Sequence, residues 1–196
     1  MKNNILSLLS KEEQKFLEVK SVNKGTYLFR EGELCSKIAF IVLGGVKIVS
    51  THYSGNEVVF NVLENGEIFG NNLIFSDSPY YKGDVVTTKD STIVFLKKEY
   101  LEKILQSNKE FLISYLNIQS NFGKKLNSTI KMLSMPSAED RFMFYLHENK
   151  DEISFHTITD LAEILNLKRE TLSRLLTKLE KKNAVRRSSH KIVKLN

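Results

Sequence analysis

The stretch from Thr157 to Asn183, TITDLAEILNLKRETLSRLLTKLEKKN, constrains the fold of this chain more than any other segment. A capping box predicts a helix start, because the Thr157 side chain can accept from the amide of Asp160 while the Asp160 side chain reaches back. Asn166 stands where the helix must turn through positive φ, a conformation that Asn tolerates next after Gly. The pattern therefore predicts two helices joined by a short turn, the second running from about Lys168 to Lys182.

The second of these helices is amphipathic. At about 100° per residue, one side collects its leucines, Leu172, Leu175, Leu176 and Leu179. The opposite arc carries guanidinium, carboxylate and hydroxyl groups, on Arg169, Glu170, Ser173, Arg174 and Thr177. Such groups can contact base edges in a DNA groove, although a solvated surface helix has the same periodicity. We favour DNA recognition because the inward positions, the small residues and the turn length of both helices together fit a helix-turn-helix.

Charge is distributed unevenly along the chain. From Lys168 to Lys194 there are ten Lys or Arg residues and two acidic residues, a net charge of +8. The whole chain has 29 Lys or Arg and 23 Asp or Glu, so the other 169 residues carry 19 basic and 21 acidic groups, a net charge of −2. All of the excess positive charge lies at the C-terminal end, which favours a nucleic acid as the partner of that end.

The sequence RETLSRLLTKLE, preceded by TITDLAEILNLK, resembles the signature of the Crp/Fnr family of bacterial transcription regulators, and the resemblance covers nearly all 196 residues. It implies an α+β fold with an N-terminal antiparallel β jelly roll, a long dimerisation helix and a C-terminal winged helix-turn-helix. It also implies a homodimer that binds double-stranded DNA at a palindromic operator, with RNA polymerase as a further partner. One departure is Lys168, where the family often has a Ser or Thr N-cap, at a cost of order ~1 kcal/mol.

Between about Lys24 and Leu96 the sequence consists of short apolar runs separated by glycines, a pattern that predicts an antiparallel β domain. A capping box of Ser10 and Glu13 predicts a short helix before it, ending near Val19. Residues 54–56, Ser-Gly-Asn, are predicted to form a hairpin turn. By the resemblance, residues 1–106 form a sensor domain of the cyclic-nucleotide-binding type.

The helical period returns after Lys97, and a capping box of Ser107 and Glu110 predicts a long helix that ends near Ser134. Its apolar seam recurs at three-, four- and seven-residue steps and includes Phe111, Tyr115, Ile118, Phe122 and Leu126. The seam can pack on the β domain of its own chain, as part of it should, or against the same helix of a second copy. The resemblance favours the second arrangement, so residues 107–135 are expected to form a dimerisation helix.

Met135-Pro136 ends the long helix, and residues 136–196 are expected to form the winged helix-turn-helix domain. Residues 184–186 and 191–193 bracket Ser-Ser-His and predict a hairpin, the wing. On DNA we assign Arg169, Glu170 and Arg174 to base contacts, and Ser173 to a base or a phosphate. The phosphate contacts are assigned to Lys178, Arg187 and Lys191.

The candidate effector pocket differs from that of cyclic-AMP-binding family members. Those members carry a Gly-Glu pair followed some ten residues later by Arg-Ser, which take the ribose hydroxyl and the phosphate. Here Asn71 follows Phe69-Gly70, and Tyr81 and Lys82 stand at the Arg-Ser positions. Neither an amide nor a lysine replaces a carboxylate or a bidentate guanidinium in kind. We expect no cyclic AMP binding, and a pocket for any other small-molecule effector at Gly70, Asn71, Asn72, Tyr81, Lys82 and Tyr115; the alternative for Lys82 is a solvated surface lysine.

Other classes of function have little support in the sequence. The single cysteine, Cys35, excludes an internal disulfide, and with His52 as the only histidine of the β region we expect no metal and no cofactor. Cys35 is expected to be a small buried hydrophobe. The sequence lacks a phosphate loop, a nucleophile elbow and a metal-ligand helix motif, so we expect no enzyme activity. Without an apolar run near 18 residues or a signal sequence, the chain is expected to be cytoplasmic and not bound to a membrane.

Two alternative interpretations remain. The chain can be a β-roll module that binds a small molecule and whose helix-turn-helix contacts protein, although the basic face of that motif argues against this. It can also be a cupin-like enzyme, but such an enzyme would need metal ligands that the β region lacks.

Overall fold

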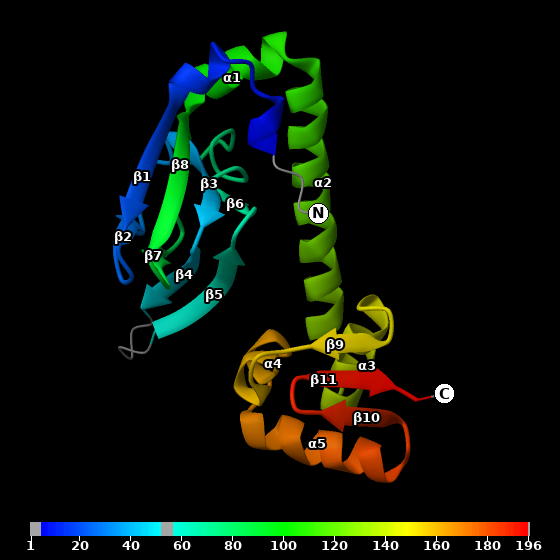
Figure 1. Cartoon of the computed structure of the whole chain (residues 1–196). Coiled ribbons are helices and arrows are strands. Elements are labelled where there is room, and N and C mark those ends of the chain that lie inside the picture. The colour runs from blue at the N-terminus through cyan, green and yellow to red at the C-terminus, as the bar shows by residue number, and fades with distance from the viewer. Residues whose placement is uncertain (1–4, 52–56, 196) are drawn as a thin grey trace. The chain divides into compact units, whose positions relative to one another are not determined.

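The computed structural model describes residues 5–51 and 57–195 (Figure 1). Contacts divide the chain into two compact units, Met1–Ser120 and Asn121–Asn196, and the division falls inside helix α2 (Lys109–Leu133). The sequence instead predicted segments 1–106, 107–135 and 136–196, which remain a prediction. Among the described residues, each helix is too short or too polar to cross a lipid bilayer.

The first unit contains two four-stranded antiparallel sheets. One sheet has the order β1-β8-β3-β6, with bounds Leu17–Val22, Ser91–Lys97, Lys37–Leu43 and Ile68–Phe69. The other has the order β2-β7-β4-β5, with bounds Tyr27–Phe29, Asp84–Thr87, Gly45–Thr51 and Glu57–Glu64. These sheets confirm the predicted antiparallel β jelly roll. The predicted hairpin turn at residues 54–56 and the side chain of His52 lie outside the described residues.

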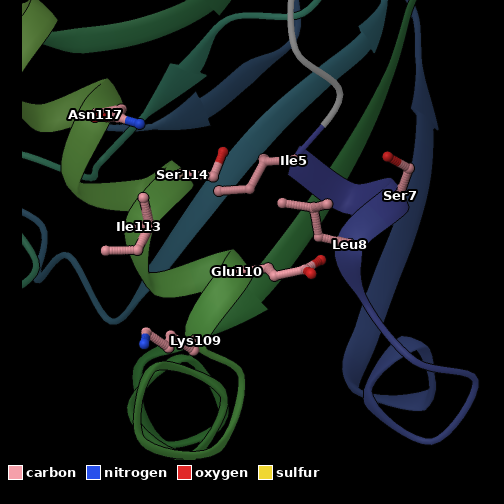
Figure 2. A pocket seen from close by; sticks show the side chains of 8 residues that line it. All are labelled: Ile5, Ser7, Leu8, Lys109, Glu110, Ile113, Ser114 and Asn117. Atoms are coloured by element: carbon pink, nitrogen blue, oxygen red, sulfur yellow. The ribbon is translucent and has the colours of Figure 1, made fainter.

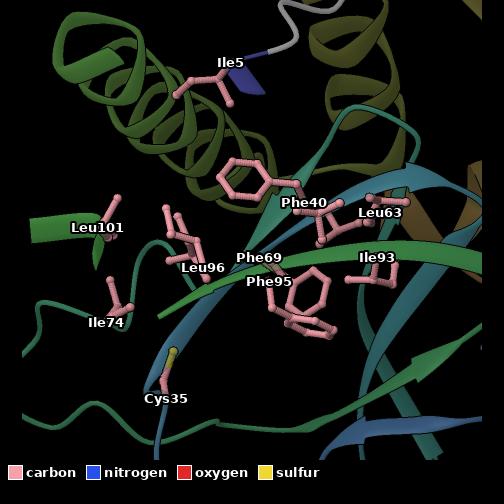
Figure 3. Close-up of a cluster of buried hydrophobic side chains, with 14 of the residues drawn as sticks. Ile5, Cys35, Phe40, Leu63, Phe69, Ile74, Ile93, Phe95, Leu96 and Leu101 are labelled. Atoms are coloured by element: carbon pink, nitrogen blue, oxygen red, sulfur yellow. The ribbon is translucent and has the colours of Figure 1, made fainter. Parts of the chain in front are cut away.

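The core of the first unit lies between its sheets and is completed by helices (Figure 3). Strands β3 and β8 are each buried at four consecutive positions, so both of their faces are covered, and Ile38, Ile93 and Leu96 are fully buried. Phe29 stacks on Tyr81 with ring centroids 4.4 Å apart. Helix α1 (Lys98–Ser107) adds Leu101 and Ile104, and the first turns of α2 add Phe111 and Tyr115.

The composition of this core shows that the predicted dimer seam of the long helix is wrong in its N-terminal part. Phe111 and Tyr115, expected on a dimer interface, are buried in the core of their own unit with exposed fractions of 0% and 3%. Ile118 is half-buried and packs against the same core, whereas Phe122 and Leu126 are exposed. The sheets of the first unit therefore cover the N-terminal part of the predicted seam.

The N-terminal segment also differs from its prediction. The capping box is formed, since the Ser10 amide donates to Glu13 Oε2 at 2.7 Å and the Glu13 amide donates to Ser10 Oγ at 3.3 Å. In the described part of this segment, the structure forms two single 3₁₀ turns, η1 (Ile5–Leu8) and η2 (Glu13–Phe16), and no α-helix. The expected helix to Val19 is wrong, because β1 starts at Leu17 and pairs with β8.

The N-cap of helix α2 lies one residue later than the predicted cap, Ser107. Asn108 Oδ1 accepts from the amide of Phe111 at 3.0 Å, while the Ser107 hydroxyl donates back to the carbonyl of Lys103. Asn108 also donates through Nδ2 to the carbonyl of Leu8 at 2.9 Å. The cap of α2 is therefore Asn108, which also ties this helix to the N-terminal turns.

The second unit is a winged helix-turn-helix. Its helices are α3 (Ala138–Glu148), α4 (Ile158–Ile164) and α5 (Arg169–Lys181). Its sheet has the order β10-β11-β9, with bounds Val185–Ser188, Lys191–Lys194 and Glu152–Ser154. Figure 1 shows this sheet beside α3 and α5. The β10–β11 hairpin, whose last pair is Ser188 with Lys191, forms at the predicted wing.

Candidate nucleic-acid interface

The turn between α4 and α5 forms as its sequence predicts. Thr157 Oγ1 accepts from the amide of Asp160 at 3.1 Å, and Asp160 Oδ2 accepts from the amide of Thr157 at 3.0 Å. Asn166 adopts a φ of 51°, and the amide of Leu167 donates to the carbonyl of Ala162 at 2.9 Å. A left-handed residue after α4 reverses the chain within a few residues, so α5 starts beside the helix that precedes it.

Helix α5 separates a buried face from an exposed polar face. Its inward leucines, at most 8% exposed, are Leu172, Leu175, Leu176 and Leu179. The predicted base-contacting residues are all exposed on the other side: Arg169, Glu170, Ser173, Arg174 and Thr177. Thr177 Oγ1 donates to the carbonyl of Ser173 at 3.0 Å, so its proton is used inside the helix and only its oxygen lone pairs remain for a ligand.

Each residue that the sequence assigned to phosphate contacts has a carboxylate partner inside the second unit. Lys178 Nζ lies 2.8 Å from Glu139 Oε2, and this ion pair lowers the pKa of Glu139. Arg187 is half-buried with Nη2 3.3 Å from Glu180 Oε2, and Lys191 Nζ lies 2.8 Å from Glu152 Oε1. These partners come from α3, α5 and β9, so a phosphate would have to compete with a carboxylate at each cation.

Two arginines of the same unit were missed by the sequence analysis. Arg186 is exposed on β10, between the buried Val185 and the half-buried Arg187, and strand alternation would have identified it. Arg141, on α3, donates through Nη1 to the carbonyls of Asn166 and Leu165 at 3.2 and 3.5 Å. No local pattern predicts this contact, since it joins α3 to a turn about 25 residues further along the chain.

In the first unit, the predicted effector residues fall into a buried and an exposed group. Asn71 is 4% exposed, and its Nδ2 donates to Gln119 Oε1. The carbonyl of Asn71 accepts from Gln119 Nε2 at 2.7 Å and from the Tyr115 hydroxyl at 3.2 Å. Gln119, on α2, was missed by the sequence analysis. Asn72 and Lys82 are exposed.

Space around Gly70 is filled by neighbouring side chains. Gly70 has a φ of 80°, and a Cβ atom at this position would lie 3.2 Å from Cys35 Sγ and 3.3 Å from the Tyr81 hydroxyl. Burial raises the pKa of Tyr81, of Cys35 and of Tyr115, the last to about 12. These three groups are therefore neutral at physiological pH, and the Cys35 thiol does not form a reactive thiolate.

Figure 2 shows an open groove of about 480 Å³ between η1 and the first turns of α2. Its lining includes Ile5, Leu8 and Ile113 with Lys109 and Glu110 at one end, and none of the predicted effector residues. Among the residues that the structure describes, no three His, Cys, Asp or Glu side chains are grouped to hold a metal ion.

Comparison with known proteins places family matches on both units. Residues 19–108 match the cyclic nucleotide-binding domain family, and residues 146–191 match the MarR family. The chain is 24% identical over 177 residues to the anaerobic regulatory protein of Bacillus subtilis, across 85% of this chain and 74% of that protein. It is 22% identical over 170 residues to the cyclic AMP receptor protein of Thermus thermophilus, across 83% and 77%.

A solved structure supports the same fold for both units. A CooA mutant from Carboxydothermus hydrogenoformans matches with a TM-score of 0.77 and 16% identity, across 100% of this chain and 93% of that chain. The fold of the two units and the two regulators of similar sequence indicate the same family. The chain belongs to the Crp/Fnr family of transcription regulators.

Proposed function

We propose that this regulator binds DNA as a homodimer and recognises a palindromic operator through α5. The observation that carries the proposal is the exposed face of α5, where Arg169, Glu170 and Arg174 lie opposite a fully packed leucine face. Arginine donors fit O6 and N7 of guanine, and a glutamate accepts from N4 of cytosine. Each half-site is therefore expected to contain at least one essential G·C pair.

Positive charge around α5 supports binding to a polyanion. The segment from Lys168 to Lys194 carries a net charge of +8, and the rest of the chain is slightly acidic. Lys178, Arg187 and Lys191 remain our candidates for phosphate contacts. Because each already has a carboxylate partner, binding exchanges one anion for another and does not capture an unpaired cation.

Dimerisation is supported by the outer face of α2. Besides Ile113, which lines the groove beside η1, five large apolar side chains of this helix are between 38% and 55% exposed: Leu116, Phe122, Leu126, Ile130 and Leu133. They recur at steps of three to six residues along one helix, and the same face of a second copy would remove them from water. A dimer places two α5 helices on half-sites whose centres lie roughly 34 Å apart, and thereby accounts for an operator with two-fold symmetry.

An effector other than cyclic AMP, where one acts, would bind the first unit. Support for excluding cyclic AMP comes from Asn71, whose amide is bonded to Gln119, and from Tyr81, which is buried against Phe29. Lys82 is exposed and lacks the bidentate geometry of arginine. Membership of the Crp/Fnr family supports a protein that acts by binding and not by catalysis, in the cytoplasm, with RNA polymerase as a further partner.

Selection from random double-stranded DNA tests the proposal. Wild-type protein should yield a palindromic consensus, and Glu170→Ala should lose the preference at one position per half-site at a cost of about 1–3 kcal/mol. Glu163→Ala is the matched control, because Glu163 is an exposed glutamate of α4 outside the base-contacting face. It should leave the consensus unchanged. A wild-type protein that selects no consensus would contradict the proposal, and an unchanged consensus with Glu170→Ala would remove Glu170 from base recognition.

A further inference from the structure

We propose that Arg141 is a positioning residue that sets the orientation of α5 on DNA, an inference that rests on the proposed DNA-binding function. Arg141 lies on α3, and its Nη1 donates to the carbonyl of Asn166 at 3.2 Å and, more weakly, to that of Leu165 at 3.5 Å. Leu165 is the C-cap of α4 and Asn166 is the left-handed residue of the turn. One guanidinium group thus holds the turn that leads into α5.

The chemistry of the turn suits a guanidinium group. The last carbonyls of a helix lack intrahelical partners and carry the negative end of the helix dipole. Both carbonyls accept from the same nitrogen, Nη1, and the planar guanidinium group fixes the direction of its N–H bonds, which a freely rotating lysine ammonium does not. Arg141 therefore satisfies oxygens at the C-terminus of α4 and places a positive charge there.

Stability alone does not account for an arginine at this position. Within the part of the chain that the structure describes, Arg141 Nε is buried and has no hydrogen-bond partner. Leaving a buried donor unpaired costs free energy. The side chain nevertheless lies with its guanidinium group against the turn, which is the arrangement expected of a residue that fixes the geometry of a neighbouring element.

Helix α5 depends on this support because its own N-terminus is weakly held. Its N-cap residue is Lys168, and among the described residues the Lys168 side chain makes no capping hydrogen bond. Helix α3, in contrast, is anchored by Phe142 and Leu146, both fully buried. Arg141 connects this anchored helix to Asn166, three residues before the start of α5, whose first turn carries Arg169 and Glu170. A change in the turn would shift both side chains relative to the base edges.

The test compares two affinities measured on one protein preparation: that for the selected operator and that for the same operator with its essential G·C pairs replaced. Their ratio does not depend on how much of the protein is folded, so a purely stabilising role would not alter it. Arg141→Met, which keeps the length of the stem and removes all donors, should lower the ratio about three- to tenfold, the range that the loss of one or two hydrogen bonds produces. Arg186→Met is the matched control for loss of charge, and it should weaken both affinities by the same factor.

The possible outcomes separate this inference from the proposed function. A wild-type protein without operator preference would overturn the proposed function itself. A preference retained in full by Arg141→Met would overturn only the role of Arg141. If circular dichroism shows Arg141→Met to be unfolded, Arg141→Lys decides, because it keeps the charge but not the planar guanidinium group that directs Nη1 at the turn. A lowered ratio, with faster amide hydrogen exchange at residues 165–168, supports the inference, and a wild-type ratio refutes it.

Discussion

At the scale of single residues, backbone conformation marks where α4 turns into α5. The described non-glycine residues with positive φ are Lys150, Asp151, Asn166 and Asn183. Two of them are asparagines that follow the C-cap residue of a helix, Asn166 after α4 and Asn183 after α5, and asparagine tolerates the left-handed region. The pattern of turn residues predicted Asn166. Lys150 is of a residue type that rarely adopts this conformation, and Asp151, although Asp tolerates it, follows no pattern that marked a left-handed turn there.

Asn166 provides a stability test of this conformation. Asn166→Gly should change the free energy of unfolding by less than about 0.5 kcal/mol, whereas Asn166→Val should lower it by about 1–2 kcal/mol, the cost of placing a β-branched residue at a φ of 51°. Urea denaturation followed by circular dichroism measures both. Lys168→Val is the control, because Lys168 has an extended backbone with a φ of −71°. An equal loss in Asn166→Val and Lys168→Val would show that positive φ is not the cause.

Two buried tyrosines of the first unit should respond in opposite directions to loss of the hydroxyl group. The Tyr81 hydroxyl is buried and, among the described residues, has no hydrogen-bond partner, whereas the Tyr115 hydroxyl donates to the carbonyl of Asn71. Tyr81→Phe should raise the free energy of unfolding by about 1 kcal/mol, since it removes an unpaired polar group without changing shape. Tyr115→Phe should lower it by about 1 kcal/mol, since it leaves an acceptor without one of its donors. Thermal and urea unfolding of the two variants decide this, and a loss of stability in both would contradict the assignment for Tyr81.

At the scale of elements, the predictions from sequence were correct where a helix or turn depends on residues within it or next to it in the chain. The capping box of Thr157, the left-handed Asn166 and the leucine face of α5 are local features, and all three form as predicted. The N-terminal helix failed because β1 gains a partner strand about 74 residues away in sequence. The cap of α2 was misplaced because Asn108 also bonds to Leu8, a contact 100 residues apart in sequence that no local pattern contains.

The apolar periodicity of helix α2 could not tell which of its side chains are buried in their own unit and which are exposed. This difference provides a test of dimerisation. Replacing Phe122 and Leu126 by Glu should dissociate the dimer and leave the chain folded, because both side chains are exposed. Phe111→Ala should instead lower the free energy of unfolding by about 3–5 kcal/mol, because Phe111 is fully buried in its own unit. Light scattering at tens of micromolar and circular dichroism separate the two effects. Wild-type protein that scatters as a monomer would contradict the proposed dimer.

At the scale of the whole molecule, the two units differ in how much of their chemistry the sequence revealed. The exposed face of α5 and the basic C-terminal segment could be identified from spacing and charge alone. The carboxylate partners of Lys178, Arg187 and Lys191 could not, because each of them lies on a different element from its cation. In the first unit, the sequence identified Asn71 as a departure from the cyclic AMP pattern but not the bonds from Gln119 that hold it.

These bonds lead to the expectation that the chain binds its operator without a cyclic nucleotide. A cyclic phosphate requires a fork of donors, and in this chain Tyr81 is turned into the core while Lys82 is exposed. The amide of Asn71, which stands in place of a carboxylate, is occupied by Gln119. Titration calorimetry should therefore detect no saturable binding of cyclic AMP or cyclic GMP at micromolar concentration, and operator affinity should be the same with and without them. The cyclic AMP receptor protein of Thermus thermophilus is the positive control. A micromolar Kd with one nucleotide bound per chain would show that this first unit opens to a ligand that its side chains otherwise exclude.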